Sequence, residues 1–232
     1  MKEFRESTAR TVHVQEYGIL EIGTGMPPTL DKEGRKARSQ AAKPRSVKME
    51  TENTPWRGYT LRRARPEELA VLPEVEHLAA QQFLQSAHPF AAQLESQSLE
   101  QLREYQRHGG IWVAATAEGG IAAFVLCKEV DGAAYIAELD VHPAHARQGL
   151  GRALFEVLKR HARERGYRAM LLTTFRDVPW NAPNYERWGF RIMRDDEVGP
   201  GLRAIREHET RMGLPEASRV CMVLPLEAAP GA

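Results

Sequence analysis

The sequence predicts an α+β fold in which helices flank one mixed, mostly antiparallel central sheet. Two observations lead to this prediction. Residues 111–116 and 120–128 are strand-like runs separated by a Glu-Gly-Gly turn, which is typical of an antiparallel hairpin, and residues 133–141 follow as a third neighbouring strand. An amphipathic helix and a strand at residues 168–175 come next, an order that favours a right-handed parallel connection.

The other elements follow from local start and stop signals. A strand at residues 59–64 precedes Pro66, which begins a helical segment, and Pro73 indicates a kink or a second start within that segment. A further helix is expected at residues 94–107, where Gly109 and the next glycine end it. The remaining expected elements are a helix from Leu150 that ends at Gly166, a helix at residues 202–212 and a last strand at residues 219–224.

Length and composition favour one globular domain with an appendage. The chain has 232 residues, of which 42% are hydrophobic and 27% charged, enough to bury one substantial core. Residues 31–48 carry seven Lys or Arg against two acids and almost no large apolar side chains. We therefore expect residues 1–55 to be a disordered basic extension, residues 57–226 to be the folded domain and residues 227–232 to be a tail. The extension is either a basic arm that touches RNA, DNA or an acidic partner, or a solvated tail or upstream translation artefact with Met49 as the real start.

The charge balance and the cysteines narrow the class of protein. The net charge is +1, so nucleic acid is not an expected partner. No apolar stretch reaches the length of a membrane span, and the first ten residues lack the apolar region of a signal peptide, so a membrane is not an expected partner either. Cys127 and Cys221 lie in strand-like runs and indicate no disulfide framework, which favours a reduced cytoplasmic location. A homodimer stays open.

A glycine turn between strand and helix is the most informative segment. Gly149 and Gly151 stand where the helix begins, so bare backbone N–H groups converge there and the helix dipole adds partial positive charge. The Walker pattern is absent near this turn, and the dinucleotide pattern would require glycine where Leu154 stands. The turn predicts a phosphate cradle for a nucleotide-bearing cofactor.

The strand, the turn and the helix together resemble the central motif of the GNAT acetyltransferase superfamily, a strand followed by Q/R-x-x-G-x-G/A. The resemblance implies that the turn binds the pyrophosphate of acetyl-CoA, which serves as cosubstrate. The sequence departs from the motif at one position, three residues before Gly149, where Ala146 stands in place of the usual Gln or Arg. The cradle residues implied by the match are Arg147, Gln148, Gly149, Leu150, Gly151, Arg152 and Ala153.

A second segment, residues 173–192, resembles the later strand, short helix and Tyr-x-x-x-Gly-Phe ending of the same family. The resemblance places Tyr185 at the position of the tyrosine that protonates the departing CoA thiolate. The interval from Asn181 to Tyr185 is shorter than the asparagine-to-tyrosine interval most common in the family. Either Asn181 or Asn184 is therefore expected to contact the pantetheine arm.

An amine acceptor requires a base, because an alkyl ammonium is almost fully protonated at neutral pH. Glu138, on the strand leading into the cradle, is the candidate base, and the resemblance places a catalytic Glu there in some members. The alternative is that Glu138 only pairs with an Arg or binds substrate. Asp140 shares its strand parity. Leu139 and Val141 are expected to line the cofactor, and the resemblance implies that the Val141 N–H polarises the acetyl carbonyl.

Several other residues have two interpretations. Trp180, Phe175 and Trp188 line an acceptor pocket or belong to the core. Asp177 holds an acceptor ammonium or caps the short helix. No metal is expected, although His142 and His145 have H-x-x-H spacing, because no carboxylate or cysteine cluster accompanies them. We expect Glu209 and Arg211 to lie on a solvated helix face.

The predicted function is N-acetyl transfer from acetyl-CoA directly to an amine. No cysteine stands where an acyl-enzyme would form, so a ternary complex is expected, with the pantetheine arm inserted where the sheet splays between the strands ending near Val141 and Phe175. The acceptor carries no motif, and a small molecule is favoured over a protein. The alternatives are a non-catalytic CoA-binding sensor, or a protein or ribosome-associated acetyltransferase that uses the basic arm.

Overall fold

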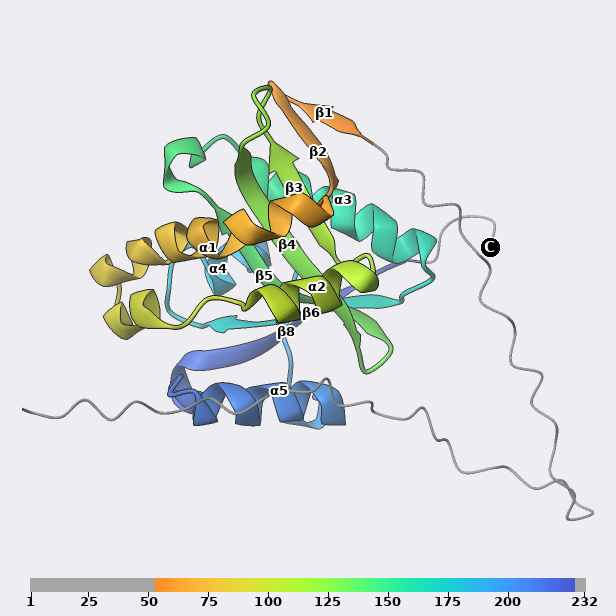
Figure 1. The fold of residues 1–232 in the computed structure, drawn as a ribbon. Helices are drawn as coiled ribbons and strands as arrows, with labels where there is room; N and C mark the ends of the chain where they lie inside the picture. Colours follow the sequence, from red (N-terminus) through yellow and green to blue (C-terminus); the bar gives the residue numbers. More distant parts are fainter. Residues whose placement is uncertain (1–52, 228–232) are drawn as a thin grey trace, which may run out of the picture. The chain divides into compact units, whose positions relative to one another are not determined.

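An eight-stranded mixed sheet forms the centre of the computed structural model, which describes residues 53–227 (Figure 1). The sheet order is β1-β2-β3-β4-β5-β6-β8-β7, and all described pairs are antiparallel except β5 with β6. The predicted fold class is therefore confirmed. The strands are β1 (Thr54–Trp56), β2 (Tyr59–Arg63), β3 (Ile111–Ala115), β4 (Ile121–Val130), β5 (Ala133–Val141), β6 (Ala169–Phe175), β7 (Arg191–Ile192) and β8 (Arg219–Pro225). The helices are α1 (Leu72–Ala80), α2 (Leu99–Arg107), α3 (Leu150–Glu164), α4 (Ala182–Arg187) and α5 (Pro200–Arg211).

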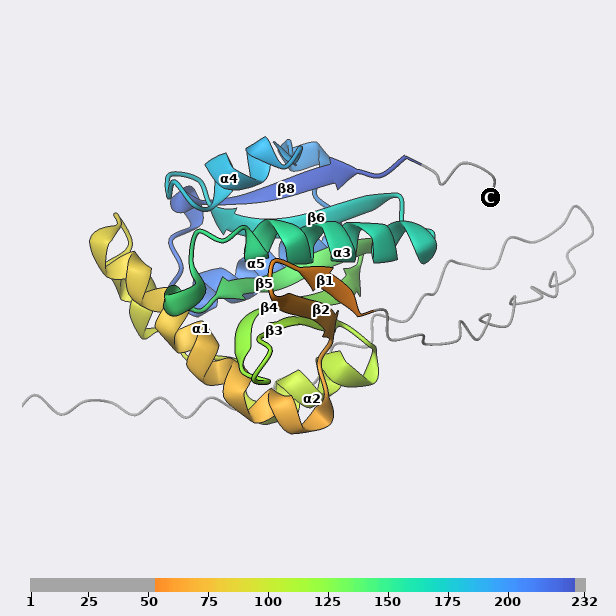
Figure 2. The same ribbon diagram turned by 90° about the horizontal axis from the view of Figure 1, so that it is seen from above.

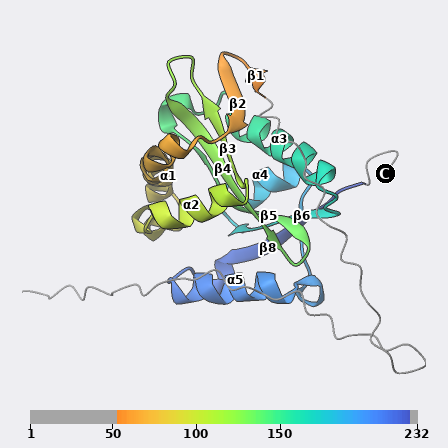
Figure 3. The same cartoon turned by 45° about the vertical axis from the view of Figure 1, so that its right-hand side comes forward.

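Helices cover both faces of the sheet, as the view from above shows (Figure 2). The α1 and α2 helices lie on one face, where Leu72 and Leu102 pack against Phe124 and Leu126 of β4. The α3 and α4 helices lie on the other face. The α5 helix lies beside β8 on the α1 side, and its Leu202 belongs to a third buried cluster (Figure 3). Five consecutive residues of β4, from Ala122 to Leu126, are buried. Because successive side chains of a strand point to opposite faces, both faces of the sheet need cover.

The α3 helix is the best-defined amphipathic element. Its buried stripe faces the sheet with helical spacing, and charged residues occupy the other side. Gly149 is its N-cap in the left-handed region (φ +79°), and Gly166 follows its C-cap with the same φ, as the sequence predicts. The buried residues of the stripe are Leu150, Ala153, Leu154, Phe155, Val157, Leu158 and Ala162.

The sheet splays between its two parallel strands. Pairing of β5 with β6 is limited to three residues, Ala134 to Ile136, opposite Met170 to Leu172. Where β5 pairs with β4, Leu126 faces Glu138 but Cys127 faces Ile136, so Ala137 is an extra residue in β5. Such a bulge bends the strand and increases its twist, which explains why β5 leaves β6 at this point. The predicted splay is present.

The main differences from the sequence-based expectation are one helix boundary and two short strands. The helix expected at residues 94–107 begins at Leu99, because the Ser98 side chain accepts from the Gln101 N–H and caps it. The short strands β1 and β7 were not expected, and β1 begins at Thr54, inside the stretch assigned to the extension. The prediction that residues 1–55 are a disordered basic arm otherwise lies outside the described residues, as does most of the tail.

Two further observations concern membrane-spanning helices and the cysteines. Between residues 53 and 227 no helix is both long enough and apolar enough to cross a bilayer. Cys127 and Cys221 are both free thiols.

Candidate active site

Three free backbone amides meet at the start of α3. The first helical hydrogen bond runs from the Ala153 N–H to the Gly149 carbonyl, at 2.9 Å. The N–H groups of Leu150, Gly151 and Arg152 therefore precede any acceptor within the helix. With the helix dipole, they give this end of α3 the partial positive charge that the sequence predicts. Ala153 differs from the other predicted cradle residues, because its N–H is used by the helix and its side chain is buried.

The predicted cofactor strand lies directly against this turn. A Cβ added at Gly151 would lie 3.5 Å from Leu139 Cδ2 and 3.7 Å from Val141 Cγ2 and Trp188 Cη2. Leu139 and Val141 are half-buried. The turn, the end of β5 and the end of α4 thus converge on one place, next to the splay.

The side chains of the turn differ in what they can offer a ligand. Arg147 is exposed and takes part in no ion pair among the described residues. Arg152 forms an ion pair with Glu156 at 2.5 Å and lies over the Phe155 ring at 5.1 Å. Glu156 also pairs with Lys159 at 2.8 Å, so the charge of Arg152 is only partly balanced. Gln148 accepts a hydrogen bond from the Tyr59 hydroxyl at 3.0 Å.

Three carboxyl groups interact where β5 leaves β6. Burial raises the pKa of Glu138 to about 7, although the positive charge of Arg219 lowers it in part. Burial and the charges of Glu138 and Glu76 raise the pKa of Asp140 well above its ordinary value, and Asp140 hydrogen-bonds with Glu138. The pKa of Glu76, on α1, rises to about 8, mainly through burial and then through Glu138. Asp140 Oδ2 is buried without a hydrogen-bond partner.

Tyr185 belongs to the same group of side chains. Burial raises its pKa above the ordinary value, and the negative charges of Glu138 and Asp140 raise it further, so the phenol keeps its proton at neutral pH. Its ring meets Trp188 and Phe190 edge-on, with centroids 5.3 and 5.7 Å apart. The charges of Glu138 and Asp140 therefore act on the phenol of Tyr185.

An ion cluster on the α5 side was missed by sequence reasoning. Glu209 was expected on a solvated helix face, and that expectation is wrong: its side chain is 12% exposed and pairs with Arg219 at 2.5 Å and with Arg206 at 2.6 Å. Thr173 of β6 also donates to Glu209 and receives a hydrogen bond from Tyr135. Apart from the i,i+3 spacing of Arg206 and Glu209 on α5, no sequence signal joins these residues, because they come from four separate elements. Arg211 is exposed, as expected.

The two candidate asparagines differ in their contacts. Asn181 is the N-cap of α4, and its side chain makes no hydrogen bond among the described residues. The Asn184 carbonyl oxygen accepts from Arg187 at 3.0 Å. Asn181 therefore has the freer amide, and both residues are half-buried.

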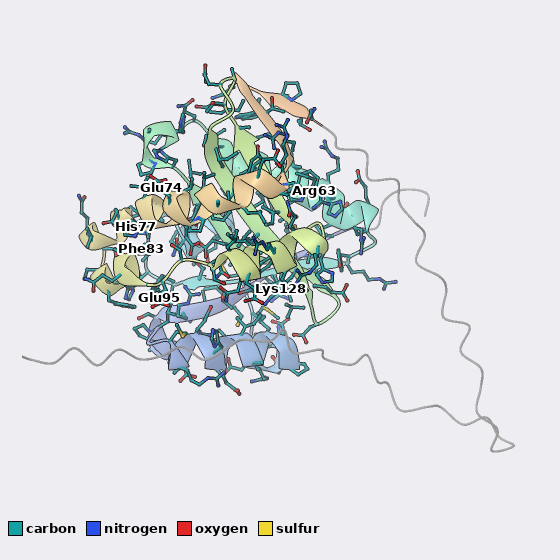
Figure 4. All side chains as sticks on the ribbon, viewed as in Figure 1. Arg63, Glu74, His77, Phe83, Glu95 and Lys128 are labelled. Carbon is teal, nitrogen blue, oxygen red and sulfur yellow. The ribbon has the colours of Figure 1, made fainter. Side chains whose placement is uncertain are left out.

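An aromatic cluster joins the segment after α1 to the end of β6. His88 is buried, stacks on Phe175 with ring centroids 4.3 Å apart and lies 2.8 Å from an Asp177 carboxylate oxygen. Phe83, labelled in Figure 4, and Trp180 pack at the same place. Asp177 thus pairs with His88 and does not cap α4. Trp188 is separate from this cluster, because it packs on Phe155.

The two histidines of the H-x-x-H spacing, His142 and His145, make local hydrogen bonds near the glycine turn. His142 Nδ1 accepts from the Ala144 N–H at 3.1 Å, and His145 lies against Tyr59. In residues 53–227 no group of three or more His, Cys, Asp or Glu side chains is arranged to hold a metal ion.

The sheet has one splayed parallel pair, and a glycine turn begins the helix that follows it. This is the arrangement that the resemblance to the acetyltransferases leads us to expect. The model of the acetyltransferase (GNAT) family matches residues 72–190, more than half of the chain, and the chain belongs to this family. The family expected from the sequence is confirmed.

Solved structures agree with this assignment at the level of the fold. An acetyltransferase of the GNAT family from Listeria monocytogenes 4b F2365 is similar with a TM-score of 0.55 at 13% identity, over 75% of this chain and 100% of that one. PaiA N-acetyltransferase from Thermoplasma acidophilum, solved in complex with coenzyme A, has a TM-score of 0.52 at 15% identity, over 72% and 99%. The ribosomal-protein-S18-alanine N-acetyltransferase from Escherichia coli has a TM-score of 0.50 at 21% identity, over 75% and 97%.

Proposed function

We propose that the protein transfers the acetyl group of acetyl-CoA directly to the amine of an acceptor. The observation that carries this proposal is the convergence of an anion-binding turn, a splay in the sheet and the Glu138–Asp140–Tyr185 group. Direct transfer is supported by the state of the thiols: burial raises the pKa of Cys127 to about 12 and also raises that of Cys221, so neither is a ready nucleophile.

Coenzyme A would bind along the turn and into the splay. The amides of Leu150, Gly151 and Arg152 would hold the diphosphate, and Arg147 has the free charge to assist them. The pantetheine arm would lie beside Leu139 and Val141, where β5 still pairs with β4 but no longer with β6. Asn181 is the better placed of the two asparagines to hydrogen-bond with that arm, since its amide is free.

Glu138 and Tyr185 would handle the protons. Glu138, directly or through a water, takes a proton from the acceptor ammonium, and the free amine attacks the thioester carbonyl carbon. The Val141 N–H stabilises the oxyanion of the tetrahedral intermediate. The intermediate collapses as the carbon–sulfur bond breaks, and Tyr185 gives its proton to the leaving thiolate. The acceptor nitrogen then loses its second proton, through water, back to the Tyr185 phenolate, which leaves the neutral amide product. A base with a pKa of about 7 is half ionised at neutral pH and so suits this role.

The three buried carboxyl groups also indicate which kind of acceptor would bind. Burial is the main cause of the raised pKa values of Glu76, Glu138 and Asp140, and the charge of Glu138 raises those of Glu76 and Asp140 further. A bound cation would stabilise the ionised carboxylates in this buried place. An amine substrate arrives as such a cation. We therefore propose a positively charged amine as the acceptor, and a small molecule in preference to a protein, because the splay and its acids lie between packed elements.

Two measurements test the proposal. Calorimetry with coenzyme A should give saturable binding, and thiol release from acetyl-CoA should appear with at least one member of a panel of small amines, polyamines, amino acids and peptide N-termini. Binding without turnover on any amine would favour a non-catalytic sensor. Salt-sensitive turnover on a peptide that is lost on deleting residues 1–52 would favour a protein-directed enzyme. Absence of CoA binding would refute the proposal.

A further inference from the structure

The hydroxyl of Tyr59 joins β2 to the phosphate-binding turn. Tyr59 Oη lies 2.9 Å from His145 Nδ1 and donates to Gln148 Oε1 at 3.0 Å. The Tyr59 and His145 rings meet at 88° with centroids 5.6 Å apart. The strand that supplies Tyr59 is therefore attached to the turn on both sides of Arg147.

The hydrogen bonds fix which atoms face outward. The single hydroxyl proton of Tyr59 goes to Gln148, so the contact with His145 requires a proton on Nδ1 of the imidazole. Because the Gln148 oxygen is occupied, its amide N–H₂ is the end left for a ligand. That amide group has no acceptor among the described residues. In the sequence, Gln148 stands two residues before Leu150, the first of the three residues whose backbone N–H groups are free at the start of α3.

The backbone of the turn gives Tyr59 a reason to be there. Arg147 is in the left-handed region (φ +60°), as is Gly149 (φ +79°). For a residue with a Cβ this conformation costs roughly 1–2 kcal/mol, so contacts on both sides must hold it. His145 and Gln148 stand on the two sides of Arg147, and both are bound by the same hydroxyl.

We propose that Tyr59 is a positioning residue that holds the turn in its anion-binding conformation and presents Gln148 Nε2 as a donor to the diphosphate. This role rests on the proposed function. It also accounts for Ala146, since Gln148 supplies the side-chain donor that an alanine lacks.

Calorimetric titration of the full chain with coenzyme A tests the inference. Tyr59→Phe removes one hydrogen-bonding hydroxyl and should weaken binding about fivefold. Tyr167→Phe is the matched control, because that hydroxyl donates to Glu129 at 2.8 Å, away from the turn, and its removal should leave the dissociation constant unchanged. Equal affinities of the two variants would overturn the role of Tyr59.

Two changes at Gln148 separate donation from packing. Gln148→Glu keeps an oxygen for Tyr59 but replaces the donor by a negative charge, so binding should weaken at least about tenfold. In a Gln148→Ala background, Tyr59→Phe should have little further effect, because the two residues act as a unit. Retained affinity in Gln148→Glu, or fully additive losses, would contradict the inference. Failure of the unsubstituted protein to bind coenzyme A would instead refute the proposed function.

Discussion

Replacing Glu138 by Gln should stabilise the protein at alkaline pH although it removes the proposed base. In the folded chain the Glu138 carboxyl keeps its proton up to about pH 7, whereas in the unfolded chain it loses it near pH 4.5. The folded state thus binds more protons between these values, and the free energy of unfolding falls as the pH rises through them. Glutamine cannot ionise and does not carry this penalty.

The size of the effect follows from the same values. When the pKa of a carboxyl is moved from 4.5 to about 7 by folding, its full ionisation lowers the free energy of unfolding by about 3 kcal/mol. Because Glu138 shares its proton with Asp140, the stability that Glu138→Gln gains is expected to be about 1–3 kcal/mol. Urea denaturation at pH 5 and pH 8.5 measures it, with Glu129→Gln, an exposed carboxyl on β4, as control. The stability difference between Glu138→Gln and the unsubstituted protein should be small at pH 5 and reach its full size at pH 8.5. A difference independent of pH would refute this account of the carboxyl group.

Three further outcomes are expected. Tyr185→Phe should bind coenzyme A normally and lose about 10²-fold or more in thiol-release turnover; unchanged turnover would remove Tyr185 from the mechanism. Gly149→Ala and Gly132→Ala should each destabilise by about 1 kcal/mol in urea, since both glycines have positive φ, but only the first should weaken CoA binding in calorimetry. Glu209→Ala should lower the free energy of unfolding by about 3 kcal/mol, because it leaves Arg219 unpaired. The control is Glu216→Ala, at an exposed residue, which should change the free energy of unfolding little. Equal losses in the two variants would contradict a structural role for Glu209.

The fold and the glycine turn at the start of α3 could be predicted because their signals are local. A hairpin turn, an amphipathic stripe on α3 and two glycines at its start each lie within a short stretch of sequence. The start of α2 was misplaced for a related reason: Ser98 is an obvious cap only when it is known that residues 94–98 leave the helical conformation.

The acid and ion clusters could not be predicted, because they depend on contacts between distant segments. Glu76 reaches Glu138 from a helix some sixty residues earlier in the chain, and Arg219 comes from the last strand. The bulge at Ala137 also has no clear sequence signal, yet it turns β5 away from its neighbour. The same holds for Tyr59, whose partners lie almost ninety residues away.

The short ladder between β5 and β6 has a mechanical consequence. Strands β1 to β5 and strands β6, β8 and β7 are joined within the sheet by only three residue pairs, fewer than in the ladder on either side. Two blocks connected by so few hydrogen bonds can rotate against each other more easily than either can deform internally. Hydrogen-exchange rates at the amides of Ala134 to Ile136 would therefore report whether the blocks move as one body, and a molecule lodged between them would act as a wedge that fixes their angle.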